Sequence, residues 1–242
     1  MRIFITGSAD GLGRAAADTL LAAGHRVVVH ARSAGRMDAA RDLIDRGAEA
    51  VVGDLAEPDA VHRVAEQVTE LGHHDAVIHN AGVYRDAHVL PVNVVAPYLL
   101  TALMDRPARL IYLSSGMHHS GHPRVNGLDW SGRRPSGSYS DSKLFITTLM
   151  AAVATRWPTT ISNAVDPGWV PTRMGGAGAP DDLRLGHLTQ EWLATSDDAN
   201  ANTSGGYWYH QQRRQPHSAV HDTRFQQKLL DELLRFTGVG LD

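Results

Sequence analysis

A tyrosine and a lysine one helical turn apart are the residues of this chain best suited to acid–base chemistry. Tyr139 and Lys143 open a strongly helical segment, and side chains four residues apart lie on the same face of a helix. A nearby ammonium favours the phenolate and lowers the pKa of a tyrosine from about 10. The spacing therefore predicts that Tyr139 acts as a general acid or base. The alternative is a surface lysine one turn from a packed tyrosine.

Two further polar side chains could assist this tyrosine. Ser115 follows the apolar run 109–113, and a hydroxyl at a strand end can hydrogen-bond a substrate oxygen and stabilise developing charge. Asn93 lies four residues before Pro97. A proline there kinks the helix and frees a backbone carbonyl, which leaves room for an ordered water beside Asn93. Serines at strand ends are common, so an ordinary strand end is the alternative for Ser115.

A glycine-rich turn follows the first apolar run of the chain, at Thr6-Gly7-Ser8-Ala9-Asp10-Gly11-Leu12-Gly13. Gly7 permits a tight turn, Gly11 lets backbone amides approach a pyrophosphate, and Gly13 allows a helix to pack closely on a strand. The turn predicts a dinucleotide site, and a merely tight strand–helix turn is the alternative. The residues expected to contact the dinucleotide here are Gly7, Ser8, Asp10, Gly11, Leu12 and Gly13.

The end of the second strand distinguishes NADP from NAD. An NAD site needs a carboxylate there for the ribose 2′-hydroxyl, but this chain has Arg32 and Ser33, which could hold a 2′-phosphate. Asp10 argues the other way, because its carboxylate adds negative charge near the phosphates. We expect NADP(H) to be preferred and keep NAD(H) as the alternative.

Two later segments are expected to reach the same cofactor. Asp54 and Leu55 follow the third strand, where Asp54 either accepts a hydrogen bond from the adenine amino group or caps the next helix. Asn80, Ala81 and Gly82 follow the fourth strand. Their small size lets the chain pass close to a cofactor, and the Asn80 amide can bridge neighbouring strand ends.

The elements that must position these residues alternate along the chain. Unbroken Val/Ile/Leu blocks are typical of strands buried on both faces, and helix-like stretches lie between them. We therefore predict an α/β fold, a Rossmann-type doubly wound parallel sheet of about seven strands in three layers, within one domain over 1–242. The expected strands are 3–6, 27–29, 50–52, 76–79, 110–113, 161–165 and 207–209. The expected helices are 13–23, 35–46, 59–71, 92–104, 139–156 and 225–236.

Composition excludes several other classes of protein. The chain has 242 residues, no cysteine and a net charge of -3, so thiolate metal sites and cysteine nucleophiles are excluded. No basic run suits nucleic acid, and the longest apolar stretch, 144–154, is too short to span a bilayer. His118, His119 and His122 lack an obvious carboxylate or fourth ligand, so we expect no metal. A cytoplasmic protein with a small-molecule partner is expected.

The motifs, taken in order, resemble the short-chain dehydrogenase/reductase family, in its compact single-domain type. The resemblance spans residues from about 2 to about 210, and it implies reversible hydride transfer between NADP(H) and a carbonyl/alcohol pair. It also implies that Tyr139 exchanges the proton, Ser115 orients the carbonyl, Lys143 holds the nicotinamide ribose, and Asn93 holds a relay water. The matching residues are 6–13, 80–82, Asn93, Ser115, Tyr139, Lys143 and 166–172. By the same resemblance Pro167, Gly168, Val170 and Thr172 would line the nicotinamide.

The segment between Ser115 and Tyr139 is longer than the minimal family pattern. In this it resembles the retinol dehydrogenase and protochlorophyllide reductase branch, which favours NADP. The substrate-binding loops are expected at about 84–90, 117–138 and 169–202, with Ser115, Met117, Tyr139, Trp169 and Met174 contacting a bulky, mostly apolar substrate.

Two questions stay open at this point. The tail helix 225–236 has a broad apolar face, which packs either on the domain or on a partner subunit in a homo-oligomer. The alternative function is a catalytically silent NADP-binding redox sensor or regulatory module. Such a module would be expected to lack Tyr139, Lys143 or Ser115, and all three are present.

Overall fold

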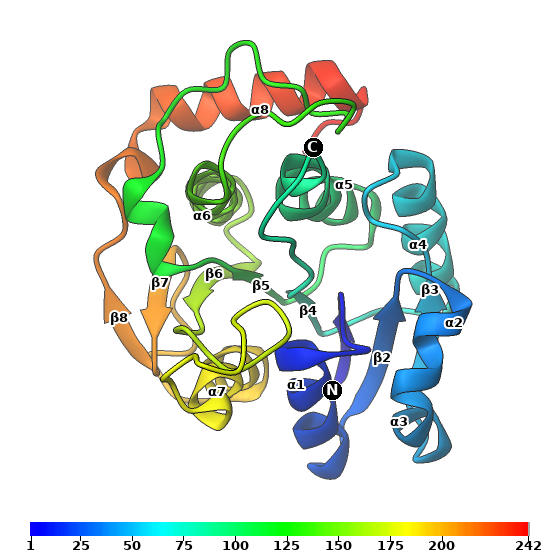
Figure 1. Ribbon diagram of the computed structural model, residues 1–242. Helices are drawn as coiled ribbons and strands as arrows, with labels where there is room; N and C mark the ends of the chain where they lie inside the picture. The colour runs from blue at the N-terminus through cyan, green and yellow to red at the C-terminus, as the bar shows by residue number, and fades with distance from the viewer. Residues whose placement is uncertain (242) are drawn as a thin grey trace.

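One eight-stranded sheet forms the centre of the molecule (Figure 1), a computed structural model that describes residues 1–241. The strands lie in the order β3-β2-β1-β4-β5-β6-β7-β8. The first seven in the chain pair in parallel, and β8 pairs with β7 in the antiparallel sense. The strands are β1 (Arg2–Ile5), β2 (Arg26–Ala31), β3 (Glu49–Val52), β4 (Ala76–His79), β5 (Arg109–Leu113), β6 (Ile161–Asp166), β7 (Gly206–Tyr209) and β8 (Gln212–Arg214).

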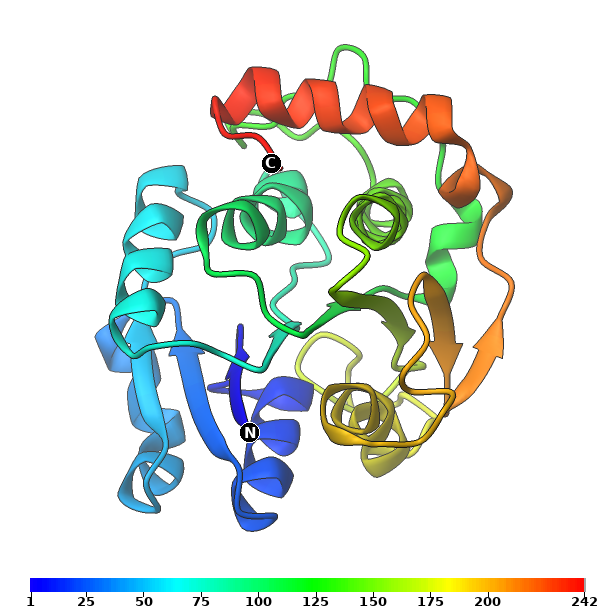
Figure 2. The same cartoon turned by 180° about the vertical axis from the view of Figure 1, so that it is seen from behind.

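Helices cover both faces of this sheet. Helices α1 and α7 lie on one face, and α4, α5 and α6 lie on the other, with α8 crossing the outer side of α5 and α6 (Figures 1 and 2). The α-helices are α1 (Gly11–Ala22), α2 (Ala34–Met37), α3 (Arg41–Asp45), α4 (Pro58–Glu70), α5 (Ala96–Leu103), α6 (Tyr139–Arg156), α7 (Leu183–Thr195) and α8 (Thr223–Thr237). The 3-10 helices are η1 (Asp38–Ala40), η3 (Gly116–Ser120) and η4 (Ser218–His221), and η2 (Pro91–Val95) is a π-helix. No helix within residues 1–241 is long and apolar enough to cross a bilayer.

The apolar core lies on both sides of the sheet, which explains the unbroken apolar runs of the central strands. Along β1, Phe4 packs into the cluster under α4, α5 and α6, whereas Ile3 and Ile5 pack into the cluster under α1 and α7. Successive side chains of a strand point to opposite faces, so a strand covered twice must be apolar at every position. Phe225 and Leu229 of α8 are buried in the first cluster, so the apolar face of the tail helix packs on its own chain.

The predicted fold class is confirmed, and the strand count is wrong by one. β8 follows β7 through a tight turn in which His210 and Gln211 adopt left-handed φ angles of 47° and 60°. This strand was not predicted because Gln212–Arg214 is polar and exposed, and because no glycine marks the left-handed turn.

Two helix predictions differ from the structure, and the α-helix α7 was not predicted. The segment 35–46 is broken into α2, η1 and α3. Helix α7 lies inside the stretch expected to be irregular and begins where the Asp182 carboxylate accepts hydrogen bonds from the Arg184 and Leu185 amides. The segment 92–104 starts as the π-helix η2 and becomes α-helical only at Ala96.

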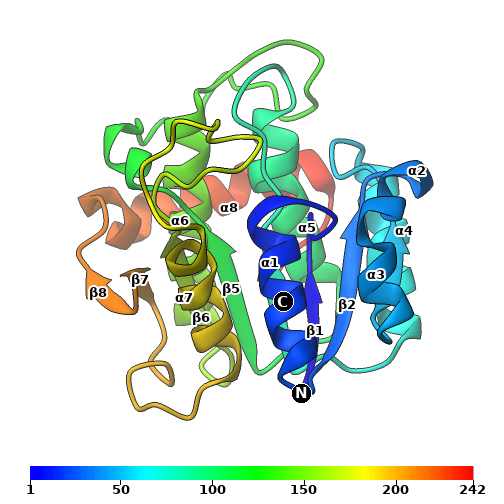
Figure 3. The same ribbon diagram turned by 60° about the horizontal axis from the view of Figure 1, so that its bottom comes forward.

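The carboxyl ends of the parallel strands lie at one edge of the molecule, and the long connecting loops gather there (Figure 3). These loops include the segments after β4, β5 and β6. Open α/β sheets bind ligands outside the carboxyl ends of their strands. A ligand site is therefore expected at this edge.

A buried histidine connects the ends of three strands at this edge. Nδ1 of His30, on β2, accepts a hydrogen bond of 3.0 Å from the Gly7 amide, and its Nε2 lies 2.9 Å from the Gly53 carbonyl. A neutral ring with its proton on Nε2 satisfies both partners. Burial lowers the pKa of His30 to about 4, against the opposing effects of the Gly53 carbonyl and the Asp54 charge. At neutral pH the uncharged ring therefore supports the glycine-rich turn.

Acid should destabilise the fold through His30. Its pKa is 6.5 in the unfolded chain and about 4 in the folded one, so the unfolded chain binds more protons between these values. The contribution is complete above pH 6.5, is lost as the pH falls toward 4, and amounts to about 3 kcal/mol. We expect thermal unfolding midpoints to fall across this range, and less steeply for His30→Gln.

The histidine variant has a matched control. His221→Gln changes an exposed histidine and should keep the wild-type dependence of the unfolding midpoint on pH. Burial also lowers the pKa values of His74 and His79, to about 4 and about 3, so the His30 variant should retain part of the acid sensitivity. A His30→Gln profile that overlays the wild type would contradict the assignment.

Candidate active site

The start of α6 fixes the position of Tyr139. Ser138 accepts a hydrogen bond from the Asp141 amide at 3.1 Å, and the Asp141 carboxylate accepts one from the Ser138 amide at 2.8 Å. This capping box satisfies two backbone amides at the helix start. The other Asp141 oxygen accepts the His122 amide at 2.7 Å, so the long insertion is attached to the same residue. The Ser-x-x-Asp spacing is a sequence signal for this helix start, which lies at the predicted residue.

Tyr139 is mostly buried and hydrogen-bonded to Ser115. Burial raises the pKa of Tyr139 to about 12; the bond to Ser115 opposes this, and the charge of Asp166 adds to it. The sequence led us to expect a lowered pKa from the neighbouring ammonium. The structure differs because burial of the phenol is the largest influence on its ionisation.

Lys143 is buried, with 4% of its surface exposed. Its Nζ donates a hydrogen bond of 2.7 Å to the Leu113 carbonyl at the end of β5 and lies 5.4 Å from the centroid of the Tyr139 ring. Burial lowers the pKa of Lys143 to about 8, and the negative charge of Asp166 opposes that shift. The lysine is therefore fixed beside the tyrosine, and its partner Leu113 lies two residues before Ser115 in the chain.

Asn93 connects the segment after β4 to α6. Its Oδ1 accepts the Val83 amide at 2.8 Å, and its Nδ2 donates to the Val83 carbonyl and to the Ser142 hydroxyl, both at 2.9 Å. A methyl group placed on Gly82 would lie 3.4 Å from Asn93 Oδ1 and 3.6 Å from Lys143 Nζ. The chain at Gly82 thus passes directly over the site, and the Asn93 side chain is bound to protein partners.

The glycine-rich turn is held against the segment after β4. Gly7 has a φ of 64°, and a Cβ there would lie 2.9 Å from the Ala81 Cα. A Cβ on Gly13 would lie 2.3 Å from the Asn80 side-chain nitrogen, which donates to the Thr6 and Gly7 carbonyls at 2.9 and 3.2 Å. Both glycines are required by close approach, and Asn80 bridges the ends of β1 and β4.

Asp10 is surrounded by partners that the sequence did not reveal. Its Oδ1 accepts the Gly11 amide at 2.7 Å, which caps α1. Its Oδ2 lies 3.3 Å from a guanidinium nitrogen of Arg36 and 3.3 Å from one of Arg173. The negative charge that argued against phosphate binding is therefore offset by two arginines. They come from α2 and from the segment after β6, so no local spacing could have shown them.

The other predicted cofactor contacts divide into exposed and buried groups. Arg32 and Ser33 are exposed at the end of β2, and the Ser33 side chain forms no cap bond with α2. Asp54 is exposed and accepts the Ala56 amide at 3.0 Å, so it stabilises a turn. Ser8 and Leu55 have buried side chains committed to the fold, so only their backbone groups could contact a ligand.

The segment after β6 covers the glycine-rich turn. Asp166 ends the strand, with Oδ1 accepting the Gly168 amide and Oδ2 accepting the Tyr207 hydroxyl, each at 3.0 Å. The methyl group of Thr172 would lie 3.5 Å from a Cβ on Gly11. Pro167 and Gly168 are half-buried, and Val170 is buried. The predicted nicotinamide segment therefore faces the predicted phosphate turn.

Exposed apolar side chains lie next to Tyr139 and on the segments that follow β5 and β6. The Tyr84 ring lies 4.8 Å from the Tyr139 ring, and the Met174 methyl would lie 3.9 Å from a Cβ on Gly82. Exposed large apolar groups in one place mark a binding surface. Those in this region are Tyr84, Met117, Trp169 and Met174, with exposed fractions of 41%, 42%, 60% and 46%.

His118 proved to be structural. Its Nδ1 lies 2.8 Å from the Ser115 carbonyl, and its Nε2 accepts the His217 amide at 3.0 Å. Burial lowers the pKa of His118 to about 4, so the neutral ring anchors the backbone of Ser115. Across residues 1–241, no three His, Asp or Glu side chains are arranged to hold a metal ion.

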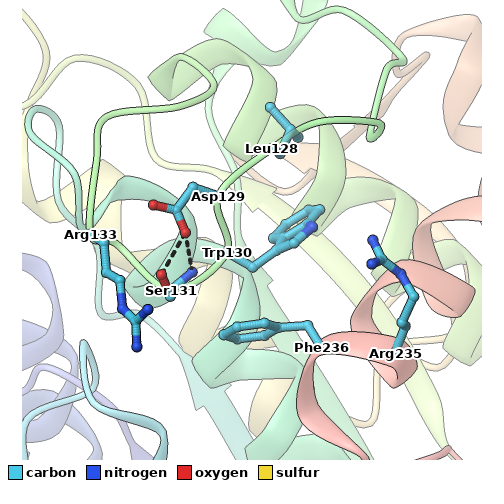
Figure 4. Close-up of a pocket in the computed structure, with 7 residues that line it drawn as sticks. All are labelled: Leu128, Asp129, Trp130, Ser131, Arg133, Arg235 and Phe236. Atoms are coloured by element: carbon cyan, nitrogen blue, oxygen red, sulfur yellow. Dashed lines mark hydrogen bonds between the residues drawn. The ribbon is translucent and has the colours of Figure 1, made fainter.

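Two cavities lie outside the catalytic group itself. One of about 370 Å³ begins at Gly116, next to Ser115, and is lined also by Asp166 and Tyr207. Another of about 390 Å³ lies between the insertion and the end of α8, where Trp130 and Phe236 form its apolar walls (Figure 4). None of the predicted catalytic or cofactor residues lines the second cavity.

Several known proteins are similar to this chain in sequence. The family model described as short chain dehydrogenase matches residues 1–106. An uncharacterized oxidoreductase of Emericella nidulans is 37% identical over 257 residues, which cover 100% of this chain and 98% of the relative. The short-chain dehydrogenase chry4 of Gibberella zeae is 32% identical over 254 residues, with 99% and 98% covered.

Solved structures share the fold. A crystal structure of an uncharacterized protein from Mycobacterium paratuberculosis has a TM-score of 0.82 at 22% identity, covering 100% of this chain and 94% of the other. A short-chain dehydrogenase from Shigella flexneri, solved with NADP, has a TM-score of 0.67 at 24% identity, covering 87% and 97%.

The predicted placement near the retinol dehydrogenase branch has only distant support. Human retinol dehydrogenase 13 is 27% identical over 198 residues, which cover 72% of this chain and 60% of that protein. The two fungal relatives are more similar and align over nearly their whole lengths. On this full-length similarity, the chain belongs to the short-chain dehydrogenase/reductase family of oxidoreductases.

Proposed function

We propose that this chain transfers hydride reversibly between NADP(H) and a carbonyl/alcohol pair, with Tyr139 as the general acid and base. The observation that carries the proposal is the meeting of three functional groups at one point. Tyr139 is hydrogen-bonded to Ser115, and the Lys143 ammonium lies 5.4 Å from the Tyr139 ring. Gly82 lies close to Lys143, and its neighbour Ala81 lies against Gly7 of the glycine-rich turn. Nothing in this arrangement favours a catalytically silent redox sensor.

The residues around the glycine-rich turn suit a phosphorylated dinucleotide. The start of α1 offers backbone amides and a favourable helix dipole for the diphosphate. Arg32 and Ser33, both exposed at the end of β2, would hold the 2′-phosphate of NADP(H). Arg36 and Arg173 offset the charge of Asp10, which removes the main electrostatic objection to an anion there. NADPH, when bound, supplies the hydride.

Tyr139 is suited to give up a proton in the reducing direction. Its pKa of about 12 keeps the phenol protonated at neutral pH, and its hydrogen bond to Ser115 places both hydroxyls where a substrate oxygen would bind. Ser115 donates a hydrogen bond to that oxygen while Tyr139 transfers its proton to it. Lys143, placed beside the phenol, stabilises the phenolate that remains. In the oxidising direction the Tyr139 phenolate, stabilised by Lys143, accepts the proton of the alcohol.

The remaining residues of the proposal are Asn93, for a relay water, and the exposed apolar side chains, for the substrate. Asn93 positions the segment at Val83 against Ser142 of α6, and a relay water would have to be held by its backbone or by its remaining acceptor capacity. Trp169, Met174 and Met117 are exposed around the site, which fits a bulky, mostly apolar substrate.

Replacing Tyr139 by phenylalanine should abolish turnover and leave cofactor affinity nearly intact. The substitution removes the proton donor and keeps the buried ring, so kcat should fall about 10²–10⁴-fold. NADPH oxidation with a panel of aldehydes and ketones measures the first effect, and NADPH fluorescence titration measures the second. Turnover comparable to the wild type would refute the role of Tyr139.

Lys143→Met should raise the Kd for NADPH and lower kcat/KM about 10²-fold, because it removes a ribose donor and the charge beside Tyr139. It should also raise the melting temperature, since a buried ammonium loses its hydration and is replaced by an apolar side chain. The exposed lysine of α8 offers the matched control: Lys228→Met should change neither binding nor turnover. Equal effects of the two substitutions would contradict the assignment.

Arg32→Ala should weaken NADP(H) binding about 10–100-fold and leave NAD(H) binding unchanged, because only NADP(H) carries the 2′-phosphate. Arg63→Ala, an exposed arginine on α4, serves as the control for the loss of one positive charge. Side-by-side titration with both cofactors gives the ratio of Kd values. An equal loss of affinity for both cofactors would show that Arg32 does not bind the 2′-phosphate.

A further inference from the structure

A cleft beside Ser115 contains groups that the proposed proton transfer does not use. Its volume is about 370 Å³, within the range of small-molecule sites. Gly116, the residue after Ser115, is one of its lining residues. The charge of Asp166, another lining residue, acts on Tyr139 and Lys143. The lining residues are Gly116, His119, Asp166, Tyr207, Tyr209, Arg214 and Gln215.

Aromatic rings form the walls of this cleft, and one of them is held rigidly. The Tyr207 ring lies 4.5 Å from the buried His118 ring and 6.2 Å from the His119 ring, and its hydroxyl is bound to Asp166. Tyr209 is half-buried and stacks on His210 at 3.9 Å. Fixed rings favour a planar partner, which can stack on one ring and meet the edge of another.

Asp166 gives the cleft a hydrogen-bond acceptor. Each Asp166 oxygen accepts one hydrogen bond, from the Gly168 amide and from the Tyr207 hydroxyl. A carboxylate has about four acceptor positions, so it can accept another donor from the cleft. Its negative charge would repel a carboxylate or phosphate placed there. A ligand group at this carboxylate must therefore carry a hydroxyl or an N–H.

Strand β8 contributes to the lining of the cleft through Arg214. Arg214 belongs to this strand and is exposed, and its guanidinium donates to the Gln212 side chain. The left-handed turn at His210 and Gln211 folds β8 back along β7. The eighth strand thus supplies a wall of the cleft, which connects this departure from the expected sheet to ligand binding.

We propose that this cleft holds a planar ring of the substrate, and that the ring carries a hydroxyl or N–H directed at Asp166. The substrates would then be aryl ketones or aldehydes with a hydrogen-bond donor on the ring, and their carbonyl would lie toward Ser115 and Tyr139. This inference rests on the proposed function, because it concerns the substrate of the same site. Tyr209 and His119 act as specificity residues, and they contact the ring rather than the carbonyl.

The test compares kcat/KM for ketones that differ only in the predicted features, with NADPH as the reductant. The four ketones are a hydroxyacetophenone, its methyl ether, acetophenone and cyclohexyl methyl ketone. We expect acetophenone to exceed the cyclohexyl ketone about tenfold, because only the planar ring can stack on Tyr209. We expect the hydroxyacetophenone to exceed its methyl ether by a similar factor, because the ether lacks the donor.

Two variants locate the preference in the cleft. Tyr209→Leu and His119→Leu should each lower the ratio of kcat/KM for acetophenone to kcat/KM for cyclohexyl methyl ketone about threefold or more. Phe236→Leu makes the same kind of change in the separate cavity at the end of α8 (Figure 4). It should leave the ratio at the wild-type value.

The outcomes separate this inference from the proposed function. One contrary result is that the enzyme reduces acetophenone and cyclohexyl methyl ketone with equal kcat/KM, and another is that both variants keep the wild-type ratio of these two values. Either result contradicts the binding of a planar ring in the cleft and leaves the proposed hydride transfer in place. A methyl ether as good as the hydroxy compound overturns the role of Asp166 as an acceptor. If none of the carbonyl compounds supports oxidation of NADPH by the protein, the proposed function fails, and the inference fails with it.

Discussion

The burial of Lys143 is the constraint on which the arrangement of the site depends. A buried ammonium loses its hydration at a cost of several kcal/mol, which good hydrogen bonding must offset. Here its Nζ donates to the last carbonyl of β5, and α6 is thereby held at the strand end that leads to Ser115. Tyr139 lies one turn earlier on the same helix. A single buried charge thus determines the relative position of all three groups.

Asp166 supplies the opposite charge without forming an ion pair with Lys143. Its negative charge raises the pKa of Lys143 against burial and also raises that of Tyr139, so it favours a charged lysine beside a neutral phenol. Its two oxygens are held by Gly168 and Tyr207. The same carboxylate therefore influences the pKa values of the acid–base group, fixes the segment after β6 through Gly168, and holds the Tyr207 ring of β7.

Local pattern was sufficient to predict the elements with strong apolar runs, and insufficient wherever a distant partner decides the outcome. The strand 76–79 and the helix 139–156 have the predicted bounds, because the strand is fully buried and the helix is buried over most of its length. The histidine that supports Gly7 and the arginines that offset Asp10 come from other elements. The i,i+4 spacing placed Lys143 beside Tyr139, but spacing contains no information on burial, which dominates the pKa of the phenol.

The ion pairs around Asp10 explain how a carboxylate can be compatible with an anionic ligand at the same turn. Arg36 and Arg173 are partly exposed, as is Asp10, and exposed pairs contribute little free energy and are screened by salt. One carboxylate between two guanidiniums leaves a net positive charge. The arginines can therefore turn toward a phosphate at small cost, while the Asp10 oxygen that caps Gly11 keeps the start of α1 in place.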